Sequence, residues 1–258
     1  MRLMKRILSA AAVLALSASL LVGCSSGTAS SVPVSASSAA ESTVSSVEET
    51  ASSAVDENEA AAAQLLNDLT GSYQELWPVI LADEYKQTWL DDCTALVGEE
   101  NAEAAFEKLS SMVTGDVYGE DAVEAYANGG GAYFCGFTNS LAILTFDGET
   151  STISGTDKDG NVLFSHTYHY IGMEPVHGLY EFESDDADSG EFTYFFLAPD
   201  TSAETYHIEF RYGSDAEALS QYDAGEYAYW VASGISTDCD QTMIDNCIEL
   251  FCTENLAG

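Results

Sequence analysis

The sequence predicts a mainly β domain with added helices, in which an antiparallel barrel is preceded by a helical segment and closed by a C-terminal helix. Short runs of aromatic and β-branched residues follow one another through the second half of the chain, as in an antiparallel meander. The first half instead places apolar residues at helical spacing. With 46% apolar residues, including 14 Tyr and 11 Phe, the chain has enough material for a folded core.

Helices are expected at both ends of the domain. Asp56 and Glu59 precede the alanine run 60–63 in the spacing of a capping box, so organised structure is expected to begin here. A final helix is expected over 237–253, with Ser236 as its cap. Three further helical segments are predicted between them, over 83–97, 101–113 and 121–127.

The strands of the second half are short and closely spaced. Seven are predicted, over 133–138, 141–146, 151–155, 162–171, 179–183, 192–197 and 206–212. Turn signals rich in Asp and Gly separate several of them, at 147–148, 157–161 and 185–190. Consecutive short strands with tight turns favour a meander that closes into a barrel.

The N-terminus has the pattern of a bacterial lipoprotein signal. Basic residues precede an apolar stretch over 7–22, which closes with the lipobox-like Leu21-Val22-Gly23-Cys24. We expect residues 1–23 to be a signal peptide and Cys24 to be lipidated, because only a thiol can form the thioether. The alternative is an ordinary signal peptide followed by a chance cysteine. The protein is thus expected outside the cytoplasm, anchored by lipid to the bacterial cell membrane.

A tether is expected between this anchor and the domain. Residues 24–55 are almost entirely Ser, Ala, Thr, Val and Glu without an aromatic residue, a composition that cannot bury enough surface to offset its ordering entropy. It is typical of a flexible spacer. The remaining residues, 56–258, fit a single domain.

The charge balance excludes some function classes. Forty-three acidic and seven basic residues give a formal net charge of -36, so the chain lacks the basic footprint that nucleic acids require. Motifs of serine hydrolases, zinc proteases, P-loop proteins and dinucleotide-binding enzymes are also missing from the sequence. We therefore expect a binding protein rather than an enzyme.

Four segments together resemble a known family. They are D-L-T-G-S-Y-Q-E-L-W-P at 68–78, L-T-F-D-G at 144–148 with Y-H-Y-I-G at 168–172, the F-E to G-E-F-T-Y hairpin at 182–194, and H-I-E-F-R-Y-G-S-D to A-L at 207–219. In this order they are similar to the ZinT (YodA) zinc-binding, lipocalin-like domain, which also forms the C-terminus of AdcA-type zinc lipoproteins.

The resemblance implies a calycin-type barrel with added helices and a metal site. In the family, three histidines at one barrel mouth bind zinc or another divalent metal. Carried over by position, they fall on His207, Glu209 and Asp200, so two of the three are carboxylates here. The implied role is to bind scarce metal outside the membrane and pass it to a metal-import transporter.

The residues at these positions are also suited to a metal in their own right. His207 and Glu209 are two apart on a predicted strand, so both side chains point to the same face. Imidazole nitrogen with carboxylate oxygen suits Zn²⁺, and added oxygen shifts the preference toward Mn²⁺ or Ca²⁺. The alternative is a decayed site in which Glu209 pairs with Arg211.

Other candidate ligands are weaker. His166 and His169 should face opposite sides of a strand, whereas His177 lies in a turn after Pro175 and could reach the mouth. Residues 157–161 mimic the start of an EF-hand loop but lack its glycine and closing glutamate, so a hairpin turn is expected. The acidic segment 185–188 is expected to be a solvated turn.

Five cysteines follow Cys24, and none forms a C-x-x-C motif, which argues against a thiolate zinc site. Cys247 and Cys252 are too far apart along one predicted helix to bridge each other. Any disulfide should therefore join the C-terminal helix region to Cys93 or Cys135, with at least one thiol left free.

A second function remains open at this point. The domain could be a metal-free calycin-like module that holds a small apolar ligand in an aromatic-lined barrel or contacts a protein partner. Convergence of Asp200, His207 and Glu209 would favour the metal, whereas an open aromatic pocket would favour the ligand.

Overall fold

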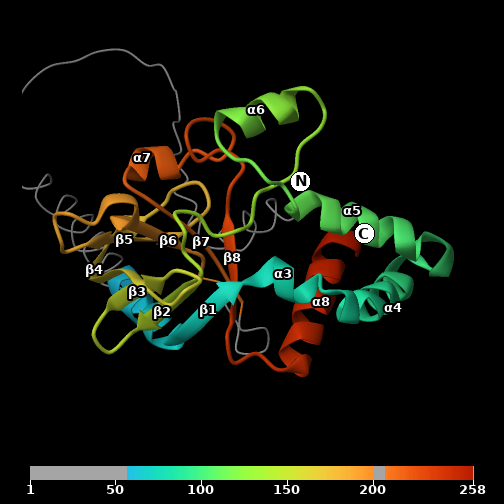
Figure 1. Ribbon diagram of the computed structural model, residues 1–258, viewed down its shortest axis with the longest axis horizontal. Coiled ribbons are helices and arrows are strands. Elements are labelled where there is room, and N and C mark those ends of the chain that lie inside the picture. The colour runs from blue at the N-terminus through green and yellow to red at the C-terminus, as the bar shows by residue number, and fades with distance from the viewer. Residues whose placement is uncertain (1–56, 200–206, 258) are drawn as a thin grey trace, which may run out of the picture.

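A closed barrel of eight antiparallel strands forms the centre of the computed structural model, which describes residues 57–199 and 207–257 (Figure 1). The predicted signal peptide, Cys24 and the tether lie outside the described residues. Each strand pairs with the next, and the first also pairs with the last. The strands are β1 (Gly71–Glu75), β2 (Ile143–Asp147), β3 (Thr152–Thr156), β4 (Val162–Met173), β5 (Tyr180–Ser184), β6 (Tyr194–Leu197), β7 (His207–Gly213) and β8 (Ala232–Ser236).

Helices lie before the barrel, between its first two strands and after its last strand. A helix over 57–68 leads into β1, and the C-terminal helix packs beside the helices of the first half. The labelled helices are α3 (Leu76–Ile80), α4 (Lys86–Val97), α5 (Ala102–Val113), α6 (Glu120–Ala127), α7 (Ala216–Leu219) and α8 (Gln241–Leu256). Short 3-10 turns, η2 (Asp83–Tyr85), η3 (Glu99–Asn101) and η4 (Gly190–Phe192), connect some of these elements. The predicted fold class, an antiparallel calycin-like barrel with a helical segment before it and a helix after it, is confirmed.

Some predicted boundaries differ from the structure. The expected strand over 133–138 is only an isolated bridge, in which Phe134 pairs with Thr114 and Trp230. The last helix begins at Gln241 rather than at residue 237, because Asp240 and not Ser236 caps it: its side chain accepts from the Met243 amide.

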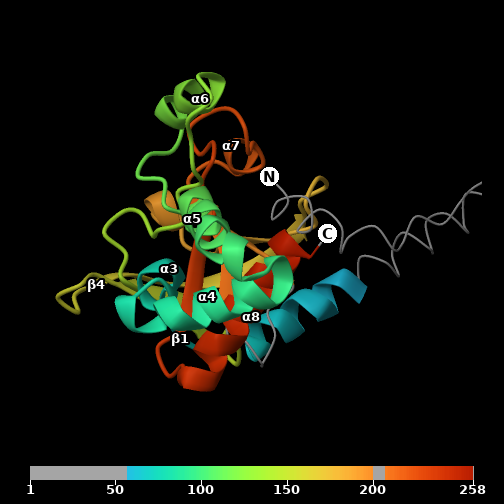
Figure 2. The same cartoon turned by 90° about the vertical axis from the view of Figure 1, so that its right-hand side faces the viewer.

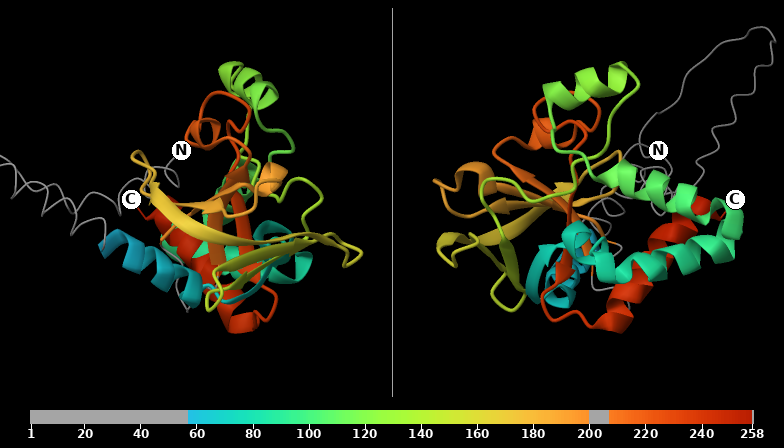
Figure 3. Two further views of the ribbon diagram at one scale, coloured as in Figure 1. Left: turned by 90° about the vertical axis from the view of Figure 1, so that its left-hand side faces the viewer. Right: turned by 45° about the vertical axis from the view of Figure 1, so that its right-hand side comes forward.

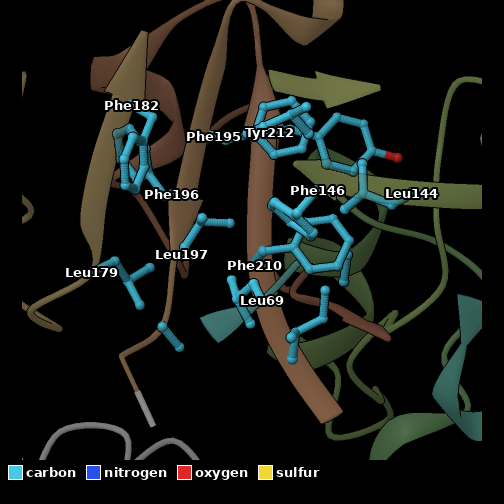
Figure 4. Close-up of a cluster of buried hydrophobic side chains, with 14 of the residues drawn as sticks. Leu69, Leu144, Phe146, Leu179, Phe182, Phe195, Phe196, Leu197, Phe210 and Tyr212 are labelled. Atoms are coloured by element: carbon cyan, nitrogen blue, oxygen red, sulfur yellow. The ribbon is translucent and has the colours of Figure 1, made fainter. Parts of the chain in front are cut away.

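The barrel is filled by aromatic and aliphatic side chains (Figure 4). Alternate residues of the strands point inward, so that Phe195 on β6 lies against Tyr212 on β7 with ring centroids 5.4 Å apart. Phe146 and Phe210 are 1% and 0% exposed. We call this inner set the barrel core. Figure 3 shows how the long β4 curves along one side of it.

A second apolar cluster joins the helices to the outer face of the barrel. Figure 2 shows the backbones of α4, α5 and α8, which contact one another on this side. It joins α3, α4, α5 and α8 to Ile235 on β8, and we call it the helical core. Trp89 and Phe251 are its largest members, with ring centroids 5.9 Å apart. Among the described residues, no helix combines the length and apolarity that crossing a bilayer requires.

Candidate metal centre

The two faces of β7 have different environments. Ile208, Phe210 and Tyr212 belong to the barrel core. His207 and Glu209 alternate with them, so both side chains lie on the opposite, outer face, and both residues are half-buried. The predicted sharing of one face is therefore what the structure shows for this pair. Asp200, the third predicted ligand, lies outside the described residues.

Arg211 continues this outer face and is fully buried. Its two terminal nitrogens donate to the main-chain carbonyl oxygens of Leu219, Gln221 and Tyr227. Its guanidinium also lies 4.2 Å from the centre of the Tyr222 ring, a cation–π contact. Arg211 therefore fastens the segment that follows β7 over the barrel wall, and both of its terminal nitrogens are engaged by carbonyl oxygens in doing so.

A buried acid–imidazole pair lies beside this arginine. Glu174 is 0% exposed, and its carboxylate accepts from the amides of Val176, at 3.0 Å, and His177, at 2.5 Å. The His177 ring lies with Nδ1 3.2 Å from Glu174 Oε2, and it packs at a tilt of 43° against the Tyr222 ring, with centroids 3.7 Å apart. Burial lowers the pKa of His177, and the Arg211 charge lowers it further, although Glu174 opposes both effects. The imidazole is thus kept neutral near pH 7.

The charge of Glu174 also acts on two neighbouring groups, Glu181 and Tyr222. Burial raises the pKa of Glu181, and the negative charge of Glu174 raises it further. Burial also raises the pKa of Tyr222, which Arg211 lowers and the charges of Glu174 and Glu209 raise. Of these influences on the Tyr222 pKa, the charge of Glu209 is the smallest. We call residues Glu174, His177, Glu181, Glu209 and Tyr222 the β7 polar cluster.

The remaining histidines are paired with acids of one turn. His166 Nδ1 lies 2.7 Å from Asp186 Oδ2, and His169 Nδ1 lies 2.7 Å from Asp185 Oδ1. The acidic turn over 185–188 thus neighbours β4 through these two contacts. No group of three or more His, Cys, Asp or Glu side chains within 57–199 and 207–257 has a spacing that could hold a metal ion.

The EF-hand-like segment is a hairpin turn, as expected. One carboxylate oxygen of Asp157 accepts from the amides of Asp159 and Asn161, both at 2.9 Å. The Asn161 side chain donates to the other oxygen at 2.9 Å. These bonds, the side-chain bond from Asn161 above all, lower the pKa of Asp157. The carboxylate is therefore used to close the turn between β3 and β4.

The outer face of β7 and the β7 polar cluster beside it were only partly predictable from the sequence. Strand alternation identifies His207, Glu209 and Arg211 as one face, and His177 stands out in its turn after Pro175. Tyr222 gives no sequence signal, because its place depends on carbonyl contacts made by Arg211 to the loop around it.

Comparison with known proteins finds similarity in structure rather than in sequence. No family model matches the chain, and no curated protein matches it. One similar solved structure is the Zn(II)-bound ZinT-like domain of Streptococcus pneumoniae AdcA, with 16% identity, a TM-score of 0.45, and coverage of 71% of this chain and 89% of that one.

A second similar structure is Zn(II)-bound AdcA from Streptococcus pneumoniae, with 14% identity and a TM-score of 0.42. The match covers 72% of this chain and 35% of AdcA, so the chain spans about a third of that longer protein. The ZinT-like domain that the sequence resembles is thus among the solved structures to which this chain is similar.

Proposed function

We propose that this domain binds a divalent metal ion, zinc foremost, at the start of β7. A lipid-anchored protein outside the cytoplasm would use such a site to scavenge metal and deliver it to an importer. The observation that carries the proposal is the placement of His207 and Glu209 on one half-buried face of β7, directly after the segment that contains Asp200.

The chemistry of the surroundings favours a cation. Imidazole nitrogen and carboxylate oxygen are both ligands that Zn²⁺ accepts, at about 2.0 to 2.2 Å. Glu209 is the carboxylate beside His207 on this face, whereas Glu174 and Glu181 lie further along β7, near Arg211. The negative charge of Glu209 would attract a divalent cation to this face and repel an anion.

The apolar-ligand alternative is less well supported by the barrel interior. Phe195, Phe210 and Tyr212 pack on one another, and Phe137 lies against Phe210 with centroids 5.4 Å apart. These rings occupy the space that a ligand would need, so a ligand would have to displace buried core side chains.

The metal proposal predicts a stabilisation that depends on His207. Saturating Zn²⁺ should stabilise the folded domain by about 2.7 kcal/mol at one hundred times Kd. His207→Ala should remove most of that gain, because it deletes the nitrogen donor of the three proposed ligands. Binding should weaken as the pH falls toward about 6, since a ligand histidine must be neutral. Thermal unfolding and isothermal titration would measure both effects.

The acidic surface attracts cations loosely, so the comparison belongs in about 0.5 M salt, where diffuse attraction is screened over a few ångströms. The matched control is His169→Ala, which removes an exposed histidine of β4 that contacts Asp185. This control should retain the full zinc response. An equal response in the parent, in His207→Ala and in the control would show that zinc binds elsewhere, and the proposal would fall.

A further inference from the structure

Two cysteines meet at the centre of the helical core. Cys93 on α4 and Cys252 on α8 have sulfur atoms 3.9 Å apart, and both residues are 0% exposed. Their helices make extensive contact along their length. The sequence leaves the partner of the C-terminal cysteines open between Cys93 and Cys135, and this proximity favours Cys93 as the partner of Cys252.

We propose that Cys93 and Cys252 form a disulfide that joins α4 to α8 whenever the protein folds in the presence of a disulfide oxidant. The oxidant is a small-molecule or protein disulfide. One cysteine thiolate attacks it and forms a mixed disulfide with release of one thiol, and the second cysteine then displaces the other. Two cysteine thiols are oxidised, one S–S bond forms, and the oxidant leaves as two thiols that carry the protons.

The local geometry requires only a small movement. A disulfide needs sulfur atoms about 2.05 Å apart, so the two atoms must approach by about 2 Å, which side-chain rotation and slight helix adjustment can supply. The helices are already held in place around the pair. Trp89 is one turn before Cys93 on α4, and its ring lies 5.9 Å from that of Phe251, the neighbour of Cys252.

The other cysteines of the described chain are placed less favourably for these two partners. Cys135 lies in the segment before β2, and its sulfur lies 3.9 Å from the Tyr133 carbonyl oxygen. Cys247 is five residues from Cys252 on the same helix, too far along the axis for a bridge. Cys239 raises the pKa of Cys247, after the larger effect of burial, so these two are the competing pair to be tested.

Burial determines when the bond can form. Removal from water raises the pKa of both thiols, so the folded protein holds little of the thiolate that exchange requires. The reaction should therefore accompany docking of the C-terminal end of α8, or follow its local opening. Once closed, the bond is sheltered from reductants by the same packing.

The test is to refold the full chain with oxidised glutathione, block remaining thiols with an alkylating agent, and map the bridge after cleavage at glutamate. Cleavage at Glu84 and Glu99 leaves Cys93 as the single cysteine of residues 85–99. Cleavage at Glu249 and Glu254 separates residues 250–254, which contain Cys252, from Cys247. The expected product is one linked pair of these peptides that reduction separates.

The bridge should also affect stability. Reduction should lower the melting temperature of the parent by about 5 to 10 °C. Cys93→Ala and Cys252→Ala should abolish this difference between oxidised and reduced protein. The matched control, Cys247→Ala on the same helix, should retain it.

Three results would overturn the proposal. The first is a pair of peptides linked through Cys239 and Cys247 in place of this pair, and the second is five alkylated thiols besides Cys24 after oxidative refolding. The third is a difference in melting temperature between oxidised and reduced protein that both alanine variants retain. Comparison of each variant with its own reduced form keeps the test valid where a substitution itself lowers stability. The outcome is independent of the metal proposal, which concerns β7.

Discussion

At the scale of single residues, Arg211 makes the hydrogen bonds that hold the segment after β7 against the barrel. It is fully buried, and its terminal nitrogens donate to the carbonyl oxygens of Leu219, the last residue of α7, and of Gln221 and Tyr227 in the segment that follows. The planar fork of a guanidinium can serve several acceptors at once, whereas an ammonium presents a compact charge at the end of a flexible stem. Burial lowers the pKa of Arg211, yet it remains a cation at neutral pH.

Replacing this arginine should be costly. Arg211→Met should lower the free energy of unfolding by about 3 kcal/mol or more, because it leaves buried carbonyl oxygens without donors. Arg211→Lys should lose less, since it keeps a positive charge but not the fork. Urea unfolding followed by tryptophan fluorescence would measure both variants. Lys158→Met, at an exposed site in the turn before β4, should change stability by no more than about 0.5 kcal/mol.

At the scale of secondary-structure elements, the interface of α4 and α8 holds an excess of negative charge. Asp92 lies next to Cys93, and one of its carboxylate oxygens is buried without a hydrogen-bond partner. Burial raises its pKa above the ordinary value, and Glu249, Asp245 and Asp91 raise it further. Because the folded state holds this proton more tightly than the unfolded state, ionisation of Asp92 opposes folding.

Asp92→Asn should therefore stabilise the domain at neutral pH. Solvent screens the site, so we expect a gain below about 1 kcal/mol. The direction of this effect follows from linkage between protonation and folding. The free energy of unfolding is higher while Asp92 is protonated, and it falls as the pH rises through the raised pKa of this carboxyl. The gain should shrink as the pH falls toward the ordinary value of 3.8. Thermal unfolding between pH 4 and pH 8 would test it, and a gain that is independent of pH would contradict it.

The start of α8 provides a second test at the scale of an element. Asp240 Oδ1 accepts from the Met243 amide at 3.0 Å and so caps the helix. Asp240→Ala should lower the free energy of unfolding by about 1 kcal/mol. Asp238→Ala, at an exposed residue just before the cap, is the matched control and should have a much smaller effect. Chemical denaturation would measure the difference, and equal losses would rule out capping as its cause.

At the scale of the whole molecule, strands with clear alternation and turn signals were predictable, and strands defined by their neighbours were not. β3 and β4 carry alternating side chains on either side of a turn closed by Asp157. β8 consists of small residues apart from Ile235, too weak a strand signal on its own, and it exists because β1 and β7 both pair with it. Glycine suits position 234 because a Cβ there would lie 3.1 Å from Ile208 and 3.3 Å from Phe137, closer than most Cβ contacts.

The candidate site likewise has features that a local sequence pattern predicts and features that only long-range packing determines. The common face of His207 and Glu209 could be predicted, because it depends only on the two-residue period of a strand. The ring contact of His177 with Tyr222 could not be predicted, because it brings together two loops that are far apart in the sequence. Long-range packing of this kind is specified by the complete fold and has no local pattern.

The seam between β1 and β8 has a consequence for how the chain reaches its native state. Tyr73 lies opposite Ser236, so the two strands that close the ring come from opposite ends of the domain. Contacts with such large sequence separation are slow to form, and folding on a scale of roughly milliseconds to seconds is the expectation for this topology. The ring stays open until β8 has found its place between β1 and β7. Until then the edges of β1 and β7 present unpaired amides and carbonyls to other chains.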